Sequence, residues 1–351
     1  MGRPEQCLLA FVVLAETIGC RSRPAPIREV DRVRQEDVRF PGSAAVTLAG
    51  TLFIPDDERR HPAIVLFHGS GPQSRMPGMG SWFAKHGVAA LTYDKRGVGE
   101  STGDFRTVPF MDLCDDGLAG IAFLKRRTDI DAARIGVWGL SQGGWLGPLA
   151  ASRSTDVKFV IAVSGPLVTP GEQMIFYYAN DLRRQGLSDA DTAAATALRR
   201  SLWRYLTTRQ GYSEMQAALA QAQGKPWFPM LQRQSDGIFA RSPQEILQDE
   251  SLSQRHWFRS EMNYDPTVAL RKLAVPGLFL YGDKDEITPV PASMDAIRAT
   301  LAGRADHRVT VEVFPGADHA MYVEEPDGSR VLSSAYLDRM ANWLGETLSS
   351  R

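Results

Sequence analysis

Apolar runs of strand length alternate with segments of helical period through most of the chain. Buried strands are predicted at 63–67, 88–93, 134–138, 157–163, 277–281 and 309–314. Helices are predicted between and after them at 79–86, 111–125, 145–151, 292–301 and 333–348. Two earlier runs, 38–40 and 46–55, predict a pair of antiparallel strands that opens the sheet. The alternation predicts an α/β fold in which helices cover both faces of a mostly parallel sheet.

The alternation stops between residues 167 and 263. This stretch lacks strong strand runs, and its pattern predicts helices at 172–185, 189–208, 212–222 and 227–249. An insertion of this size between two strands indicates a helical lid over the carboxyl edge of the sheet, where open sheets bind ligands. The alternative is a structural addition packed to one side. We therefore expect a core of residues 38–166 and 264–351 and a lid of residues 167–263.

The beginning of the chain carries a targeting signal. An apolar run over 8–15 suits the central region of a signal peptide, and small residues allow cleavage before Cys20. A cysteine at that position resembles the acylated cysteine of bacterial lipoproteins. We expect a signal peptide at 1–20, an Arg- and Pro-rich linker at 21–37, and export to the periplasm or a lipid anchor at Cys20. A cytoplasmic protein is the alternative, and membrane association that survives Cys20→Ser would exclude the anchor.

Composition narrows the class of partner. The formal net charge of -1 over 351 residues gives no field that would recruit nucleic acid, so no nucleic-acid partner is expected. Cys7, Cys20 and Cys114 lie far apart and form neither a disulfide framework nor a metal-ligand spacing. No metal or organic cofactor is expected. The sequence leaves the oligomeric state open.

The strand at 134–138 leads into the sequence Gly-Leu-Ser-Gln-Gly, and a helix follows. A serine on so tight a turn needs small neighbours two positions before and after it, and Gly139 and Gly143 meet that need. Such a turn lifts the Ser141 hydroxyl above the sheet and aims the backbone N–H of Gln142 at the same place. The pattern predicts a nucleophile elbow, with an ordinary strand-to-helix turn as the alternative.

A serine nucleophile needs a base, and the base needs a carboxylate that orients it. The strand at 277–281 runs into a loop that contains Asp283, Asp285 and Glu286. The strand at 309–314 runs into a loop that contains His319. Both loops follow the predicted nucleophile in the order acid then histidine, as this architecture requires.

These motifs together resemble the α/β-hydrolase superfamily, in particular its lidded serine esterases and its dienelactone-hydrolase-like or peptidase-like branch. The resemblance extends from about residue 46 to the C-terminus. It implies that Asp285 is the catalytic acid, because Gly282 and Pro289 fit the family's Gly-x-x-Asp-x-x-x-Pro spacing. Asp283 and Glu286 are the alternatives. It also implies that His319, at the end of a Gly-x-x-His loop, is the base.

The resemblance further implies an oxyanion hole. The strand at 63–67 is followed by His-Gly-Ser-Gly-Pro, so the N–H of Ser70 is expected to join that of Gln142, with Gly71 as the alternative donor. We expect His68 to make a structural hydrogen bond. The segment 93–101 resembles the family's Asp-x-Arg-Gly-x-Gly-x-Ser loop, whose Asp94 and Arg96 are expected to fix the loop.

The sequence thus predicts a serine hydrolase that cleaves carboxylic esters in a small-molecule substrate through an acyl-enzyme, with Ser141, His319 and Asp285 as its triad. The acyl and alcohol parts of that substrate stay open. His256 and Trp257 in the lid are the expected substrate contacts. A serine peptidase or aminopeptidase of the same fold is the alternative among enzymes. The alternative from a different class is a non-catalytic binding protein on a hydrolase fold.

Overall fold

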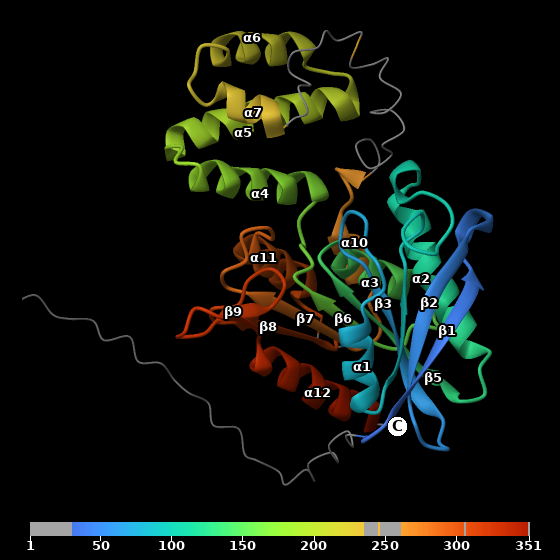
Figure 1. Ribbon diagram of the computed structural model, residues 1–351. Coiled ribbons are helices and arrows are strands. Elements are labelled where there is room, and N and C mark those ends of the chain that lie inside the picture. Colours follow the sequence, from blue (N-terminus) through green and yellow to red (C-terminus); the bar gives the residue numbers. More distant parts are fainter. Residues whose placement is uncertain (1–29, 235–244, 246–260, 305–306, 350–351) are drawn as a thin grey trace, which may run out of the picture.

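An eight-stranded sheet forms the centre of the computed structural model, which describes residues 30–234, 245, 261–304 and 307–349 (Figure 1). The strand order is β1-β2-β4-β3-β5-β6-β7-β8. β1 and β4 pair antiparallel with β2, and all other neighbours are parallel. The strands are β1 (Val33–Pro41), β2 (Thr47–Pro55), β3 (His61–Phe67), β4 (Ala89–Tyr93), β5 (Ile130–Leu140), β6 (Val160–Val163), β7 (Gly277–Gly282) and β8 (Val309–Phe314). This mostly parallel sheet confirms the predicted fold class.

Burial explains why the central strands were predicted and the first half of the edge strand was not. Every residue of β4, β6 and β7 is buried, as expected for parallel strands covered on both faces. β1 is an edge strand whose residues are mostly exposed, so it lacks an apolar run. The prediction of a linker through residue 37 is wrong from Val33 onward, because Val33 pairs with Pro55 at the start of the β1–β2 ladder.

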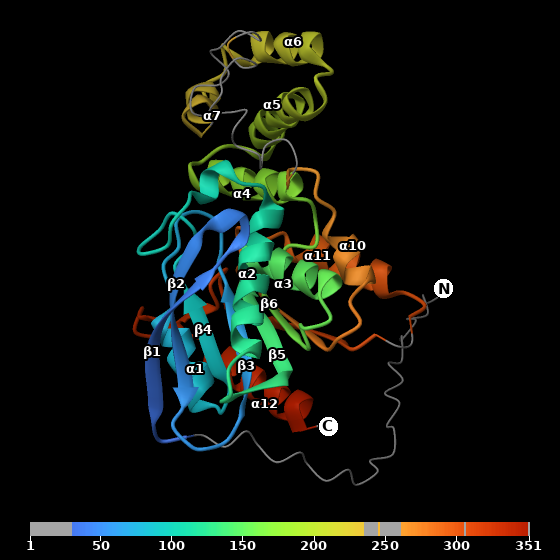
Figure 2. The same ribbon diagram turned by 90° about the vertical axis from the view of Figure 1, so that its right-hand side faces the viewer.

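Two layers of helices enclose the sheet (Figures 1 and 2). Phe83, Tyr336 and Trp343, from the helices on one face, share a buried cluster with Ile64 and Leu66 of β3. A second buried cluster joins the other face of the sheet to the helices that cover it. The helices on the first face are α1 (Pro77–Lys85) and α12 (Ser334–Ser349); those on the second are α2 (Phe110–Lys125), α3 (Gln142–Arg153), α10 (Pro266–Arg271) and α11 (Val290–Leu301).

Of the described helices between β6 and β7, four rise above the edge of the sheet at which the parallel strands end, and α4 is nearest to it (Figures 1 and 2). They have a small core of their own, to which Leu182, Leu202 and Trp227 contribute. The Gln173 side chain of α4 donates to the Ile287 carbonyl at 2.8 Å, which attaches α4 to the loop after β7. The helices are α4 (Pro170–Arg184), α5 (Asp189–Thr208), α6 (Tyr212–Ala222) and α7 (Phe228–Gln234). We refer to them as the helical insertion.

The remaining described elements are small: the 3-10 turns η1 (Ser43–Ala45) and η2 (Phe105–Thr107), and a hairpin of β9 (Tyr322–Glu324) and β10 (Arg330–Leu332). The predicted signal peptide, Cys20, His256 and Trp257 lie outside the described residues. Within the described part of the chain, no helix is both long enough and apolar enough to cross a membrane.

Candidate active site

Ser141 occupies a strained turn between β5 and α3. Its backbone has φ 56° and ψ −113°, a conformation that a residue other than glycine adopts only at a cost. The turn also requires its glycines: a Cβ at Gly139 would lie 2.1 Å from the Gly143 carbonyl oxygen, and one at Gly143 would lie 2.6 Å from that of Phe67. Ser141 donates its N–H to Val163 of β6 at 2.9 Å. The predicted elbow geometry is therefore present at the carboxyl end of β5.

His319 and Asp285 form a hydrogen-bonded pair. His319 Nδ1 lies 2.9 Å from one carboxylate oxygen of Asp285 and 3.0 Å from the other. The Asp285 side chain is fully buried, and the N–H groups of Ile287 and Thr288 donate to it at 2.8 and 2.7 Å. A carboxylate only accepts, so this contact places the proton on Nδ1 and leaves Nε2 with a free lone pair.

The three acidic residues of the loop after β7 have different partners. Asp283 accepts the Gly316 N–H at 2.7 Å, and Glu286 pairs with Arg184 at the surface. Asp285 is the one that bonds to His319. A Cβ at Gly282 would lie 2.1 Å from the Ala317 carbonyl oxygen, so the loops after β7 and β8 pack backbone against backbone. This close packing brings Asp285 to His319.

Hydrogen bonds connect the elbow with the loop that holds Asp285. Ser141 bonds to Val163, the last residue of β6. The residue that follows β6, Ser164, donates its N–H to Leu280 of β7 at 2.8 Å. The Thr288 hydroxyl in turn donates to the Ser164 carbonyl at 2.8 Å. Within the described part of the chain, no hydrogen bond joins the Ser141 hydroxyl to His319. Such bonds are often long in ligand-free enzymes and tighten when substrate binds.

Residues 68–72, which we call the β3 loop, lie against the elbow. A Cβ at Gly69 would be 3.6 Å from the Leu140 carbonyl oxygen and 3.8 Å from Ser141 Cβ. Gln142 is the first residue of α3, where helical N–H groups lack intrahelical partners. Neither the Ser70 N–H nor the Gln142 N–H donates to any described residue. Both predicted oxyanion donors are therefore available to a ligand.

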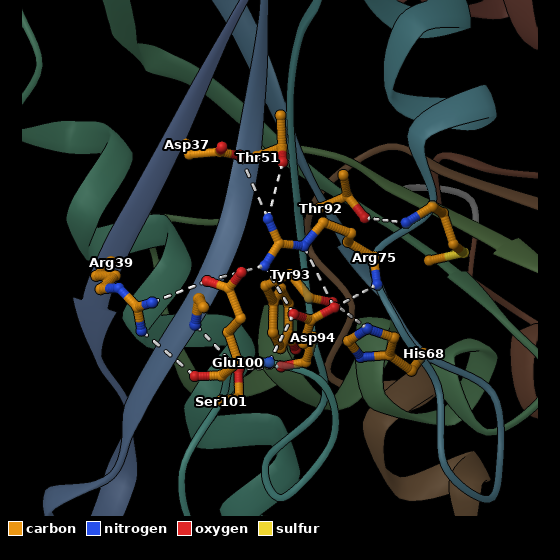
Figure 3. Close-up of polar contacts among 12 residues, drawn as sticks. Asp37, Arg39, Thr51, His68, Arg75, Thr92, Tyr93, Asp94, Glu100 and Ser101 are labelled. Carbon is orange, nitrogen blue, oxygen red and sulfur yellow. Dashed lines mark hydrogen bonds and ion pairs between the residues drawn. The ribbon is translucent and has the colours of Figure 1, made fainter.

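A polar network holds the loop that follows β4 (Figure 3). Arg75 donates to the Asp94 carboxylate at 2.7 Å, and the Glu100 N–H donates to it at 3.2 Å. His68 bonds through Nε2 to the Tyr93 carbonyl at 2.6 Å. Burial, together with the nearby charge of Lys95, lowers the pKa of His68 to about 3, so the ring is neutral. The structural bond predicted for His68 is thus present.

Arg96 fixes the same loop from the opposite side. Its Nε and Nη2 donate to the two carboxylate oxygens of Asp116 on α2, each at 2.7 Å. Both side chains are almost fully buried, and a bidentate pair in such a place has one preferred geometry. The prediction that Asp94 and Arg96 fix this loop agrees with these contacts.

A cavity of about 370 Å³ lies between the sheet edge and the helical insertion. Ser70, Gly71 and Gln142 are part of its wall, so it opens beside the elbow. Most of its other lining is apolar, including Phe105, Val108, Phe110, Trp145, Met174 and Met262. No group of three or more His, Cys, Asp or Glu residues in the described part of the chain is arranged to hold a metal ion.

Two ionisable residues of the cavity wall, Lys95 and Glu261, were not predicted. Both are buried, and burial raises the pKa of Glu261 to about 7 although the Phe110 N–H and Lys95 oppose the shift. In the sequence, Lys95 stands between an aspartate and an arginine and resembles ordinary loop charge. Glu261 lies in a polar stretch without a motif. Only the position of Lys95 inside the loop motif at 93–101 could have drawn attention to it.

Comparison with known proteins identifies the family. The sequence profile of the alpha/beta hydrolase family matches residues 64–329. The chain is 24% identical over 297 residues to an uncharacterized 31.7 kDa protein in the traX-finO intergenic region of Escherichia coli, covering 84% of this chain and 92% of that protein. The crystal structure of the alpha/beta hydrolase GrgF from Penicillium sp. sh18 is similar with a TM-score of 0.56 at 19% identity, covering 90% of this chain and 99% of that one. The Pyrococcus furiosus esterase PF2001 is similar with a TM-score of 0.55 at 14% identity, covering 94% and 98%. The profile match spans most of the chain, and the protein therefore belongs to the alpha/beta hydrolase family.

Proposed function

We propose that this protein is a serine hydrolase that cleaves small carboxylic esters through an acyl-enzyme. The observation that carries the proposal is the 2.9 Å contact between His319 and a fully buried Asp285, on the same sheet edge as the strained turn at Ser141. A histidine held by a buried carboxylate, on the same sheet edge as a serine at an elbow, is the arrangement that activates a serine.

The proposed reaction begins when the Ser141 oxygen attacks the ester carbonyl while His319 Nε2 takes the hydroxyl proton. The C–O bond to the alcohol then breaks, and His319 returns the proton to the leaving alcohol. Water attacks the acyl-enzyme in the second half, again with His319 as base, and releases the acid. Asp285 holds the imidazole and stabilises its charged form.

The Ser70 and Gln142 N–H groups are the proposed oxyanion donors, with Gly71 as the alternative to Ser70. Each donor stabilises the tetrahedral intermediate by about 3 kcal/mol if it acts like other such donors. The apolar cavity beside them suits an apolar part of the substrate, and its size of about 370 Å³ suits a small molecule. The similarity of the fold to that of an esterase from Pyrococcus furiosus supports the proposal of ester cleavage.

The test is the turnover of p-nitrophenyl acetate by Ser141→Ala and His319→Ala. Each should reduce kcat/KM on the order of 10⁴-fold, because the triad acts as a unit. Aminoacyl anilides assayed beside acyl esters separate esterase from peptidase activity. Near-parental ester turnover by either variant would remove that residue from the mechanism, and faster cleavage of anilides than of esters would contradict the choice of substrate.

A further inference from the structure

We propose that Lys95 is a positioning residue that holds both halves of the oxyanion hole in place through one ammonium group. Its Nζ donates to the carbonyl oxygens of Gly69 at 2.9 Å and Gly71 at 3.2 Å, and to the side-chain oxygen of Gln142 at 2.8 Å. The first two acceptors belong to the β3 loop and the third to the elbow. The inference rests on the proposed function, because it assigns a role within that site.

The Gly69 contact has a direct effect on Ser70. The Gly69 carbonyl and the Ser70 N–H belong to one peptide unit, which is planar and trans, so the two groups point in opposite directions. A cation that holds the carbonyl therefore fixes the direction of the N–H and aims it away from Lys95. It also polarises the peptide unit, which makes the N–H a stronger donor to a developing oxyanion.

The contact with Gln142 acts on the second donor. Gln142 carries the other proposed oxyanion N–H on its own backbone, and Lys95 ties its side chain to the β3 loop. The two donors come from loops that follow β3 and β5, and neither loop alone fixes the distance between them. The ammonium bridges the two loops and so helps to fix that distance, beside the close packing of Gly143 and Gly69 between β3 and the elbow.

Lys95 itself is held rigidly. Its backbone N–H donates to the Gln73 carbonyl at 3.0 Å. Its neighbours are each fixed by an ion pair, Asp94 with the partly buried Arg75 and Arg96 with the buried Asp116. The residue is only 3% exposed. Because the residues on both sides are held by ion pairs, the backbone of Lys95 has a fixed position, which a positioning residue requires.

Saturation of the ammonium argues against direct substrate binding by Lys95. An ammonium has three N–H donors, and Lys95 has three protein acceptors. No donor remains for a ligand. A guanidinium would not serve equally well, because a planar fork cannot reach three acceptors arranged around one point.

The arrangement has a consequence for the pH profile. Burial lowers the pKa of Lys95 to about 8, and Glu261 across the cavity opposes this shift. Below that pH the ammonium satisfies all three acceptors, whereas above it the neutral amine has only two N–H donors. His68 also faces Lys95 but stays neutral across this range. We therefore expect kcat to fall as the pH rises through about 8.

The experiment compares Lys95→Met with the wild type and with Lys125→Met as a matched control. Lys125 is a surface lysine paired with Asp156 at 2.7 Å, outside the site. Lys95→Met should lower kcat for p-nitrophenyl acetate roughly 10- to 100-fold with little change in KM, because misplaced oxyanion donors weaken transition-state binding alone. It should also lose the fall in kcat near pH 8. Lys125→Met should retain that fall, and Glu261→Gln should move it to lower pH, because Glu261 raises the pKa of Lys95.

A wild-type kcat in folded Lys95→Met, or a raised KM with unchanged kcat, would overturn the inference. So would a fall near pH 8 that persists in this variant. If Lys95→Met does not fold, Gln142→Met is tested in its place. This variant removes one acceptor of Lys95 but keeps the backbone N–H at position 142, and it should lower kcat roughly 3- to 10-fold. Full kcat in Gln142→Met would overturn the inference. Loss of turnover in Ser141→Ala with full turnover in Lys95→Met would refute the inference alone, whereas retained turnover in Ser141→Ala would refute the proposed function.

Discussion

At the scale of residues, the site separates two aspartates that stand two positions apart. Asp285 bonds to His319, whereas Asp283 accepts the Gly316 N–H and so supports the loop. Asp285→Asn should lower kcat by roughly 10³- to 10⁴-fold, because the amide favours the wrong tautomer of the imidazole. Asp283→Asn should lower kcat by less than about 10-fold. It should also lower the free energy of unfolding by about 1 kcal/mol, since it weakens one hydrogen bond.

Kinetics and thermal unfolding of the two variants check this assignment. Asp283→Asn serves as the control, because it makes the same chemical change in the same loop. A larger loss of kcat in Asp283→Asn than in Asp285→Asn, with both proteins folded, would reverse the roles of the two residues.

The residues of the site differ in how far the sequence predicts them. The elbow glycines and the late histidine stand in local motifs, and each motif reflects a local requirement such as the 2.1 Å approach at Gly139. Lys95 and Glu261 have no such local requirement. They are buried because the loop after β4 and the segment before α10 meet at the cavity, and no local sequence pattern indicates that contact.

At the scale of elements, Glu261 connects the segment before α10 with α2. Its carboxylate accepts the N–H of Phe110, the first residue of α2, and burial raises its pKa from 4.5 to about 7. The folded state therefore keeps a proton that the unfolded chain loses between these two pH values. The stability that this proton contributes is complete below pH 4.5 and is lost as the pH rises through about 7.

Glu261→Gln removes the titration while it keeps the shape of the side chain. Outside this window, the free energy of unfolding should depend on pH in the same way for the variant and the wild type. Between pH 5 and pH 8, the free energy of unfolding of the variant should rise relative to that of the wild type by up to about 3 kcal/mol. Urea unfolding at both pH values measures the difference. A difference that stays constant with pH, or that changes in the opposite direction, would contradict the buried, proton-binding state of Glu261.

The sequence predicts those strands and helices whose apolar side chains are buried. The central strands appear as apolar runs because helices cover both of their faces, and the helices of the insertion appear through their amphipathic pattern. The first half of β1 was missed because an edge strand keeps polar side chains exposed. The hairpin of β9 and β10 was missed for the same reason, since most of its residues are exposed.

At the scale of the whole molecule, the site depends on the sheet. Loops that follow β3, β4, β5, β7 and β8 are far apart in the sequence, and the parallel strands bring them to one edge. The α/β class and the order of serine, acid and histidine followed from the sequence. The distances between loops, the cavity and the bridging role of Lys95 needed the packed structure, because side-chain contacts across five loops depend on tertiary geometry.

The most direct measurement is the labelling of the protein by a fluorophosphonate, with the modified residue located by mass spectrometry. We predict rapid labelling at Ser141 in the wild type, strongly slowed labelling in His319→Ala, and none at that position in Ser141→Ala. An unlabelled Ser141 in the folded wild type, or labelling of Ser141 that does not depend on His319, would contradict an activated serine in this protein.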